Sequence, residues 1–236
     1  MTIYAIGDLH LSGDADKPMD IFGDNWQDHG AQIAGNWDHM INEDDIVLIP
    51  GDISWAMTLQ EAHVDLDMIH HLPGQKILIK GNHDYWWQSI SQLNKLYEKM
   101  YFLQNTSYKV GDYAICGSRG WGAPGDGDMD VRNTKIYNRE IKRLELSLDH
   151  AMKSGCKKII VMLHYPPTND RKQSSEFTKI FEKYPVTHVV YGHLHGEAFF
   201  NCSLRGTYNG IEYTLVSADA IGFKPHKIIS IENERG

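Results

Sequence analysis

The sequence predicts an α/β fold built around a largely parallel sheet. Short apolar runs, such as 46–49 and 157–163, are typical of buried strands, and segments with helical spacing of apolar residues separate them. Strands that alternate with helices in this way favour parallel pairing. Polar side chains follow five of the predicted strands directly, at the edge of the sheet where ligands bind. Because no linker interrupts the pattern, we expect one domain over residues 1–236.

The first half of the chain is expected to alternate between strands and helices. The strands are expected at residues 2–6, 46–49 and 76–79, and the helices at 31–41, 58–71 and 87–100. Residues 11–28, which are rich in Gly, Asp and Pro, are expected to form a loop.

The second half begins with a predicted hairpin of strands 107–110 and 113–116, joined by Gly111-Asp112. Further helices are expected at 133–154 and 177–184, and further strands at 157–163 and 187–190. Gly155 is a plausible cap for the first of these helices. The runs 211–217 and 227–231 are expected to be antiparallel strands that complete a second sheet.

The composition limits the class of partner and the compartment. A net charge of −8 without a basic block disfavours binding of long nucleic acid. Cys116, Cys156 and Cys202 are odd in number and show no paired spacing, which indicates reduced thiols and a cytoplasmic protein. No signal peptide is recognisable, and no apolar run approaches the roughly 20 residues of a membrane span. The oligomeric state is left open.

Side chains with metal-binding chemistry follow five predicted strands. They are Asp8 and His10, then Asp52, then Asn82, His83 and Asp84, then His164, and finally His193 and His195. Two residues apart on an extended backbone, Asp8 and His10 are expected to lie on the same side. A carboxylate and an imidazole together suit a divalent transition metal.

The motifs Asp-x-His, Gly-Asp, Gly-Asn-His-Asp, a lone His and Gly-His-x-His occur in that order from Asp8 to His195. This ordered set resembles the calcineurin-like metallophosphoesterases. The resemblance implies a four-layer αββα sandwich of two mixed sheets with two metal ions at the sheet edge. It also implies a ligand set: Asp8, His10 and His195 for one ion, Asn82, His164 and His193 for the other, and Asp52 as the bridge. Such mixed nitrogen and oxygen ligands suit Mn, Fe, Zn, Co or Ni.

The resemblance further implies a phosphoesterase that hydrolyses a small phosphomonoester or phosphodiester by in-line attack of a metal-bound hydroxide. His83 would then protonate the leaving oxygen, and Asp84 would orient the His83 ring. Two departures from common family patterns occur. In many members a further Asp or Asn follows the second motif, whereas here Asp52 is followed by Ile53-Ser54-Trp55, so the substrate contacts near Asp52 are not predicted. The third motif ends in Asp84 rather than in Glu. The short chain and its third motif disfavour a protein phosphatase.

Two other functions remain as alternatives: a nuclease acting on nucleic-acid ends, and a non-catalytic scaffold of the same fold. Arg119 lies in a Gly-rich loop, where its guanidinium either binds a substrate phosphate or forms a surface ion pair. Four tryptophans near the site loops either stack on a flat leaving group or pack the loops onto the core: Trp55, Trp86, Trp87 and Trp121. Loops 11–28 and 122–132 are candidates to cover the metals.

Overall fold

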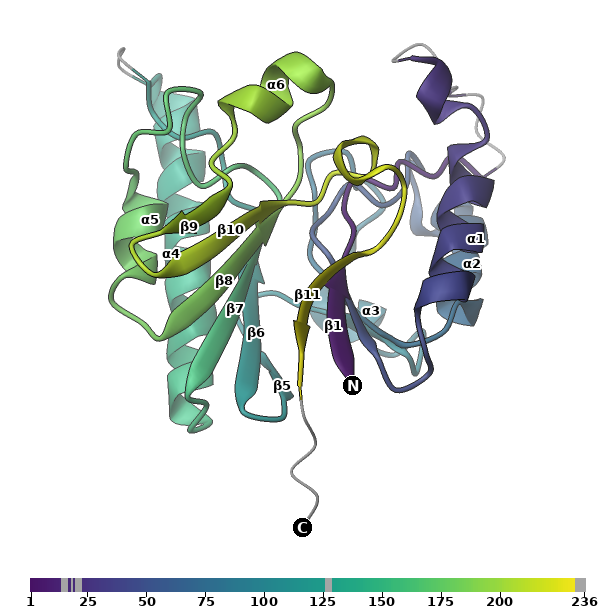
Figure 1. The fold of residues 1–236 in the computed structure, drawn as a ribbon, viewed down its shortest axis with the longest axis horizontal. Helices are drawn as coiled ribbons and strands as arrows, with labels where there is room; N and C mark the ends of the chain where they lie inside the picture. Colours follow the sequence, from purple (N-terminus) through teal and green to yellow (C-terminus); the bar gives the residue numbers. More distant parts are fainter. Residues whose placement is uncertain (14–16, 18, 20–22, 126–128, 232–236) are drawn as a thin grey trace.

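Two β-sheets face each other, and helices cover their outer faces (Figure 1). The computed structural model describes residues 1–13, 17, 19, 23–125 and 129–231. The two loops expected to cover the site, 11–28 and 122–132, therefore lie partly outside the described residues.

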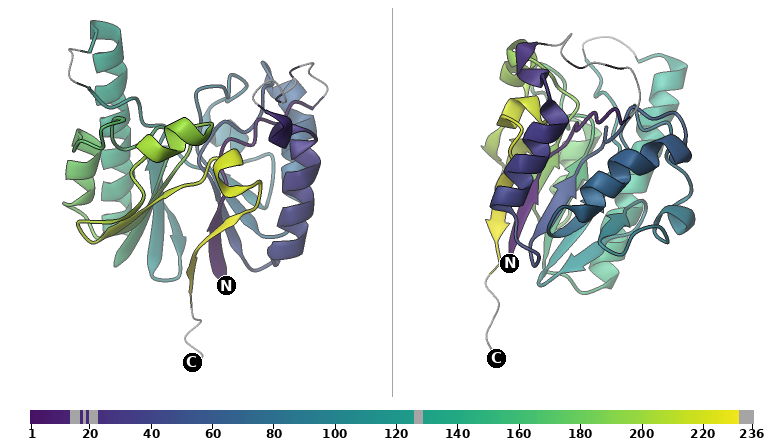
Figure 2. Two further views of the ribbon diagram at one scale, coloured as in Figure 1. Left: turned by 45° about the horizontal axis from the view of Figure 1, so that its top comes forward. Right: turned by 90° about the vertical axis from the view of Figure 1, so that its right-hand side faces the viewer.

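The first sheet has the strand order β11-β1-β2-β3-β4. Its strands are β1 (Thr2–Ala5), β2 (Ile46–Ile49), β3 (Gln75–Leu78), β4 (Met100–Phe102) and β11 (His226–Ser230). Strands β1 to β4 are parallel, and β11 runs antiparallel to β1. The helices of this half are α1 (His29–Met40), α2 (Leu59–His71) and the short α3 (Ile90–Leu93), and Asp24–Trp26 form a 3-10 turn. The right-hand view of Figure 2 shows α1 and α2 on the outer face of this sheet.

The second sheet has the order β5-β6-β7-β8-β10-β9. Its strands are β5 (Tyr108–Val110), β6 (Tyr113–Ser118), β7 (Lys158–Leu163), β8 (Val186–Tyr191), β9 (Gly206–Tyr208) and β10 (Ile211–Leu215). The inner strands are parallel, and β5 and β9 are antiparallel edges. Its helices are α4 (Val131–Lys153), α5 (Glu176–Phe181) and α6 (Glu197–Cys202), and Asp219–Ile221 form a second 3-10 turn.

Alternating side chains of each strand build the layers. On β2, Val47 and Ile49 pack in the cluster that includes residues of α1 and α2, whereas Ile46 and Leu48 pack against the second sheet. On β7, Ile160 and Met162 join the layer between the sheets, and Val161 packs with residues of α4 and α5. Strands that are buried on both faces explain the continuous apolar runs of the sequence. The α/β sandwich of two mixed sheets is thus confirmed.

The expected helix over 87–100 is wrong. Only Ile90–Leu93 of this range are helical, and Met100, the last residue of the predicted helix, is the first residue of β4. The Asn94 side chain accepts a hydrogen bond from the backbone N–H of Phe102 at 2.7 Å and donates one to its carbonyl at 3.1 Å. An Asn side chain that bonds to backbone groups competes with helix formation. Asn94 therefore ends the helix and positions β4.

The two C-terminal runs also pair differently from the expectation. β10 follows β9 through a hairpin at Asn209 and Gly210, whose φ angles are +49° and +77°, and it pairs antiparallel with β9. On its other side, β10 pairs parallel with β8. β11 belongs to the first sheet, where it pairs with β1 from Thr2 to Ala5. Its backbone groups satisfy the edge of β1 that β2 leaves unpaired.

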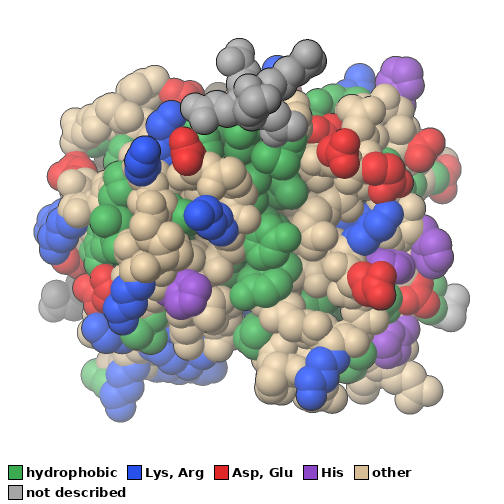
Figure 3. All heavy atoms as spheres, turned by 90° about the horizontal axis from the view of Figure 1, so that it is seen from below, with side chains coloured by type: hydrophobic (Ala, Val, Ile, Leu, Met, Phe, Trp, Pro, Cys, Tyr) green, Lys and Arg blue, Asp and Glu red, His purple; other side chains and the backbone are tan. Residues whose placement is uncertain are grey.

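The chain begins at the lower end of the sandwich in Figure 1, and the parallel strands rise to the opposite end. Seen from below, hydrophobic side chains run across the middle of the lower face, with charged side chains to either side (Figure 3). The loops that follow the parallel strands gather at the upper end. Within the described residues, no helix has the length and apolar character needed to cross a membrane.

Candidate metal centre

Within each sheet, backbone hydrogen bonds join the loops at the carboxyl ends of neighbouring strands. The N–H of Asp8 donates to the carbonyl of Gly51 at 3.0 Å, and the N–H of His10 donates to that of Asp52 at 3.0 Å. In the second sheet, the N–H of Gly192 donates to the carbonyl of His164 at 3.1 Å. These bonds hold the expected ligand residues of distant segments in one place.

Four of the expected ligands have a left-handed backbone. The φ angles of Asp8, His10, Asp52 and His193 are +53°, +44°, +51° and +74°. Residues other than glycine rarely adopt this conformation, and such strain gathers at functional sites. The extended backbone that we expected from Asp8 to His10 is therefore wrong. Tight turns, and not the alternation of a strand, aim these two side chains at the same point.

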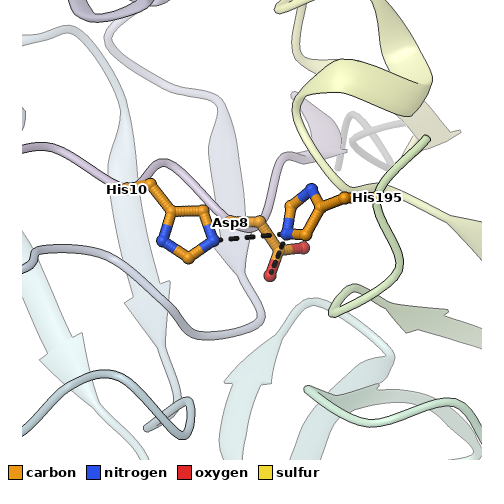
Figure 4. Close-up of side chains that lie close together, drawn as sticks. All are labelled: Asp8, His10 and His195. Carbon is orange, nitrogen blue, oxygen red and sulfur yellow. Dashed lines mark hydrogen bonds and ion pairs between the residues drawn. The ribbon is translucent and has the colours of Figure 1, made fainter. Parts of the chain in front are cut away.

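The first cluster consists of Asp8, His10 and His195, whose side chains converge in Figure 4. The Nε2 atoms of His10 and His195 are 3.2 Å apart, and the Nε2 of His195 lies 3.9 Å from Asp8 Oδ1. One ligand atom from each residue lies within 4.8 Å of the others. These three residues can hold one metal ion.

The second cluster consists of Asp52, His164 and His193, and Asn82 adjoins it. The Nε2 of His164 lies 2.7 Å from Asn82 Oδ1, 3.2 Å from His193 Nδ1 and 3.4 Å from Asp52 Oδ2. The donors again are nitrogen and oxygen atoms that face one point. The described residues thus provide a second candidate site beside the first.

The Asp52 carboxylate lies between the two clusters. Its Oδ2 is 3.4 Å from His164 Nε2 in one cluster and 3.9 Å from His10 Nε2 in the other. Its Oδ1 accepts a hydrogen bond from the backbone N–H of His83 at 2.8 Å. Asp52 thus faces the Nε2 atom of a histidine in each cluster. Asp8 Oδ1 also lies 3.7 Å from His164, but from the Nδ1 atom that faces the carbonyl of Pro50.

The charges of the site fit a bound cation. Burial, together with the neighbouring Asp52 carboxylate, raises the pKa of Asp8 to about 7 despite the opposing effect of His195. Burial also lowers the pKa of His164 and of His193 to about 3, which keeps both imidazoles neutral with free lone pairs. Asp8 Oδ1 is buried and has no hydrogen-bond partner among the described residues. A divalent cation would satisfy this oxygen and stabilise both buried carboxylates.

Hydrogen bonds behind the ligands orient two of the imidazoles. His164 Nδ1 lies 3.1 Å from the carbonyl of Pro50, and His195 Nδ1 lies 3.0 Å from Asp219 Oδ1. A proton on each Nδ1 leaves Nε2 free to bind a metal. Asp219 escaped the sequence analysis, because it lies 24 residues after His195 and outside every motif.

Asp219→Asn is expected to weaken metal binding roughly 10–100-fold, as is typical for an outer partner of a ligand histidine. The amide cannot stabilise positive charge on His195 as the carboxylate does, so the His195 ring becomes a weaker ligand. Chelator competition followed by metal analysis would measure the change. Asp38→Asn on the exposed face of α1 is the matched control, and equal affinities in the two variants would contradict the role of Asp219.

Asp84 lies behind the site, where it ties two loops together. Its carboxylate accepts hydrogen bonds from the backbone N–H groups of Asp52, Ile53, Ser54 and Gly81 at 2.7–3.3 Å. Among the described residues, no hydrogen bond joins it to the His83 ring. The expected orientation of His83 by Asp84 is therefore replaced by a structural role, in which Asp84 links the loop after β2 to the loop after β3.

Asp84→Asn is expected to lower the free energy of unfolding by about 3 kcal/mol, because its amide nitrogen would leave two buried N–H donors without acceptors. Urea denaturation monitored by circular dichroism would measure the loss. The exposed Asp44 supplies the control variant Asp44→Asn, and a similar midpoint for both variants would refute the structural role.

The remaining expected residues lie at the margins of the site. Arg119 forms an ion pair with Glu140, with 3.8 Å between Nη2 and Oε1. Because the Glu140 side chain is fully buried, this is not the surface ion pair that the sequence left as one interpretation. Trp55 stacks on His10 at a ring distance of 4.8 Å. Trp86 and Trp87 are buried and pack against Phe102, which favours the packing interpretation for these two.

Two neighbouring clusters of histidine and carboxylate at the strand ends of an α/β sandwich are two candidate metal sites. The chain belongs to the calcineurin-like phosphoesterase family, whose sequence profile matches residues 1–197.

The chain is also similar to two phage proteins and to one solved structure. Two similar proteins are the Gene 66 proteins of Mycobacterium phages L5 and D29, which are 39% identical over 77 residues and 32% identical over 114 residues. These segments cover 33% and 46% of this chain but only 37% and 54% of the phage proteins. The solved structure of Phosphopantetheinyl Hydrolase (PptH) from Mycobacterium tuberculosis matches with a TM-score of 0.58 and 12% identity, over 97% of this chain and 95% of that one. This last likeness establishes the fold alone.

Proposed function

We propose that the protein is a dinuclear metal-dependent phosphoesterase that hydrolyses a small phosphomonoester or phosphodiester. The observation that carries the proposal is the Asp52 carboxylate, which faces His10 in one cluster and His164 in the other.

We also propose that the protein acts in the cytoplasm. Its three cysteines are free thiols, which supports a reducing compartment.

In this proposal the chain divides the ligand positions between two ions. Asp8, His10 and His195 would hold one ion, and Asn82, His164 and His193 the other, with Asp52 shared by both. Divalent ions bound there would supply Lewis acidity towards phosphoryl oxygens and lower the pKa of water. The same donor set admits Mn, Fe, Zn, Co or Ni.

His83 is the group that we assign to proton transfer. Its backbone is fixed by the hydrogen bond to Asp52, and its ring lies 4.4 Å from the Trp55 ring centroid. The ring is partly exposed and forms no hydrogen bond among the described residues. It is therefore free to donate a proton to the leaving oxygen of a bound ester.

Hydrolysis of 4-nitrophenyl phosphate and bis(4-nitrophenyl) phosphate tests the proposal. Both esters would be assayed on chelator-treated protein, with Mn, Fe, Zn, Co or Ni restored singly. We expect hydrolysis only after metal addition, and the faster ester would identify the substrate class. Tight binding of two ions without hydrolysis of either ester would contradict the proposal and favour the non-catalytic scaffold.

A further inference from the structure

A polar cavity of about 330 Å³ lies beside the candidate metal centre, between the carboxyl ends of β3, β4 and β6 and the helix α4. Its charged lining residues are Lys80, Arg119, Arg139, Glu140 and Arg143. The cavity adjoins the site through two segments. Lys80 directly precedes Gly81-Asn82, and the carbonyl of Arg119 accepts a hydrogen bond from the N–H of His164 at 3.1 Å.

The lining carries an excess of positive charge. Four cationic side chains surround a single carboxylate, so three positive charges have no counterpart in the lining. The Oε1 of Glu140 lies 3.0 Å from Arg143 Nη1, 3.2 Å from Arg139 Nε and 3.8 Å from Arg119 Nη2. All three guanidinium groups thus approach one oxygen atom, and like charges held so closely repel one another.

Arg119 has an ion pair but no side-chain hydrogen bond among the described residues. Its side chain is 17% exposed, its Nε is buried without a partner, and the described residues give it no side-chain hydrogen bond. The Cζ atom of the guanidinium lies over the Trp121 ring, 4.8 Å from its centroid, and this contact holds the side chain. Buried polar groups are nearly always hydrogen-bonded. The buried Nε of Arg119, which has no partner among the described residues, is the observation that points to a ligand with an acceptor atom.

We propose that Lys80, Arg119, Arg139 and Arg143 form a second anion site that binds a phosphate group. Guanidinium groups bind phosphate oxygens through pairs of parallel N–H bonds, and a phosphate dianion would offset most of the excess charge. The source of this phosphate is either free phosphate or the second phosphate of a substrate held at the metal centre. Only the latter source rests on the proposed function.

Titration calorimetry of inorganic phosphate against the full chain in the presence of chelator tests the site without the metals. We expect one binding event in wild type that Arg139→Gln and Arg119→Gln each weaken roughly tenfold or more, since the hydrogen bonds lost are charge-assisted. Lys142→Gln is the matched control, because Lys142 lies on the same helix, is largely exposed and pairs with Glu145 outside the cavity. Circular dichroism would confirm that each variant is folded.

Phosphate binding that is absent in wild type, or that Lys142→Gln weakens as much as Arg139→Gln does, would overturn the proposal. If Arg119→Gln fails to fold, Arg139→Gln still tests the site. The Arg139 side chain is 51% exposed, so its substitution is expected to leave the fold intact. These outcomes are independent of hydrolysis, so the failure of the anion site and the failure of the phosphoesterase are distinguishable.

Metal-loaded protein separates the two sources of phosphate. Adenosine 3′,5′-bisphosphate and adenosine 5′-monophosphate would be titrated into wild type and Arg139→Gln. Tighter binding of the bisphosphate in wild type, lost in the variant, identifies a substrate phosphate. Equal binding of both nucleotides, with inorganic phosphate still bound in the chelator experiment, identifies free phosphate as the ligand.

Discussion

His83→Gln is expected to lower kcat roughly 10²–10⁴-fold while both metal ions remain bound, because general acid catalysis contributes about this factor. The ring of His83 is partly exposed at the site and forms no hydrogen bond among the described residues. The backbone N–H of His83 donates a hydrogen bond to the Asp52 carboxylate, and the substitution of the side chain leaves this bond in place. The kcat of metal-loaded protein and the metal content of the same sample would be measured together.

A comparison of leaving groups sharpens the test of His83. Phenyl phosphate has a more basic leaving oxygen than 4-nitrophenyl phosphate and depends more on a proton donor. The loss should therefore be larger for phenyl phosphate. The exposed His71 of α2 provides the control variant His71→Gln, and a loss that is equal for both esters would remove His83 from proton transfer.

Asp52→Asn is expected to reduce both metal content and turnover, by more than the roughly 10–100-fold typical of an outer partner of a ligand. Its Oδ2 faces the Nε2 atoms of His10 and His164, so one substitution affects both clusters. If two cations bind at these clusters, a neutral amide would also offset their mutual repulsion less than the carboxylate does. Metal analysis after dialysis, together with hydrolysis of the better ester, would measure both effects.

The Asp219→Asn variant is the comparison for Asp52→Asn, because Asp219 acts on one cluster only, through His195. We expect a greater loss for Asp52→Asn than for Asp219→Asn. A protein with Asp52→Asn that keeps two tightly bound ions and near wild-type turnover would show that Asp52 does not connect the clusters.

Much of the fold followed from local patterns in the sequence. The apolar runs of β2 and β7 and the turn at Gly111-Asp112 predicted strands and a hairpin that the structure contains. Asn209-Gly210 carries an equally strong hairpin signal, and it would have placed β9 against β10. The helix expected over 87–100 failed because its end depends on contacts between Asn94 and Phe102. The assignment of one domain to residues 1–236 stays a prediction.

The sequence by itself determined which side chains reach the carboxyl edge of the sheets, because the residues just after a parallel strand emerge at that edge whatever the rest of the chain does. The structure brings Asp8, His10 and His195 together in one cluster and places Asp52 beside His164 and His193 in the other. Their roles in binding and catalysis remain proposals.

Only the tertiary structure decided how the site is held. Asp219 meets His195, the backbone N–H groups after β2 converge on Asp84, and Arg119 faces Glu140 of α4 without a hydrogen bond. These contacts join segments 21 to 32 residues apart, with no periodicity between them. Sequence periodicity reports which face of an element is buried, whereas the partner of a buried polar group depends on how separate loops pack. The outer contacts of the metal centre and the basic cavity beside it were therefore visible only in the folded chain.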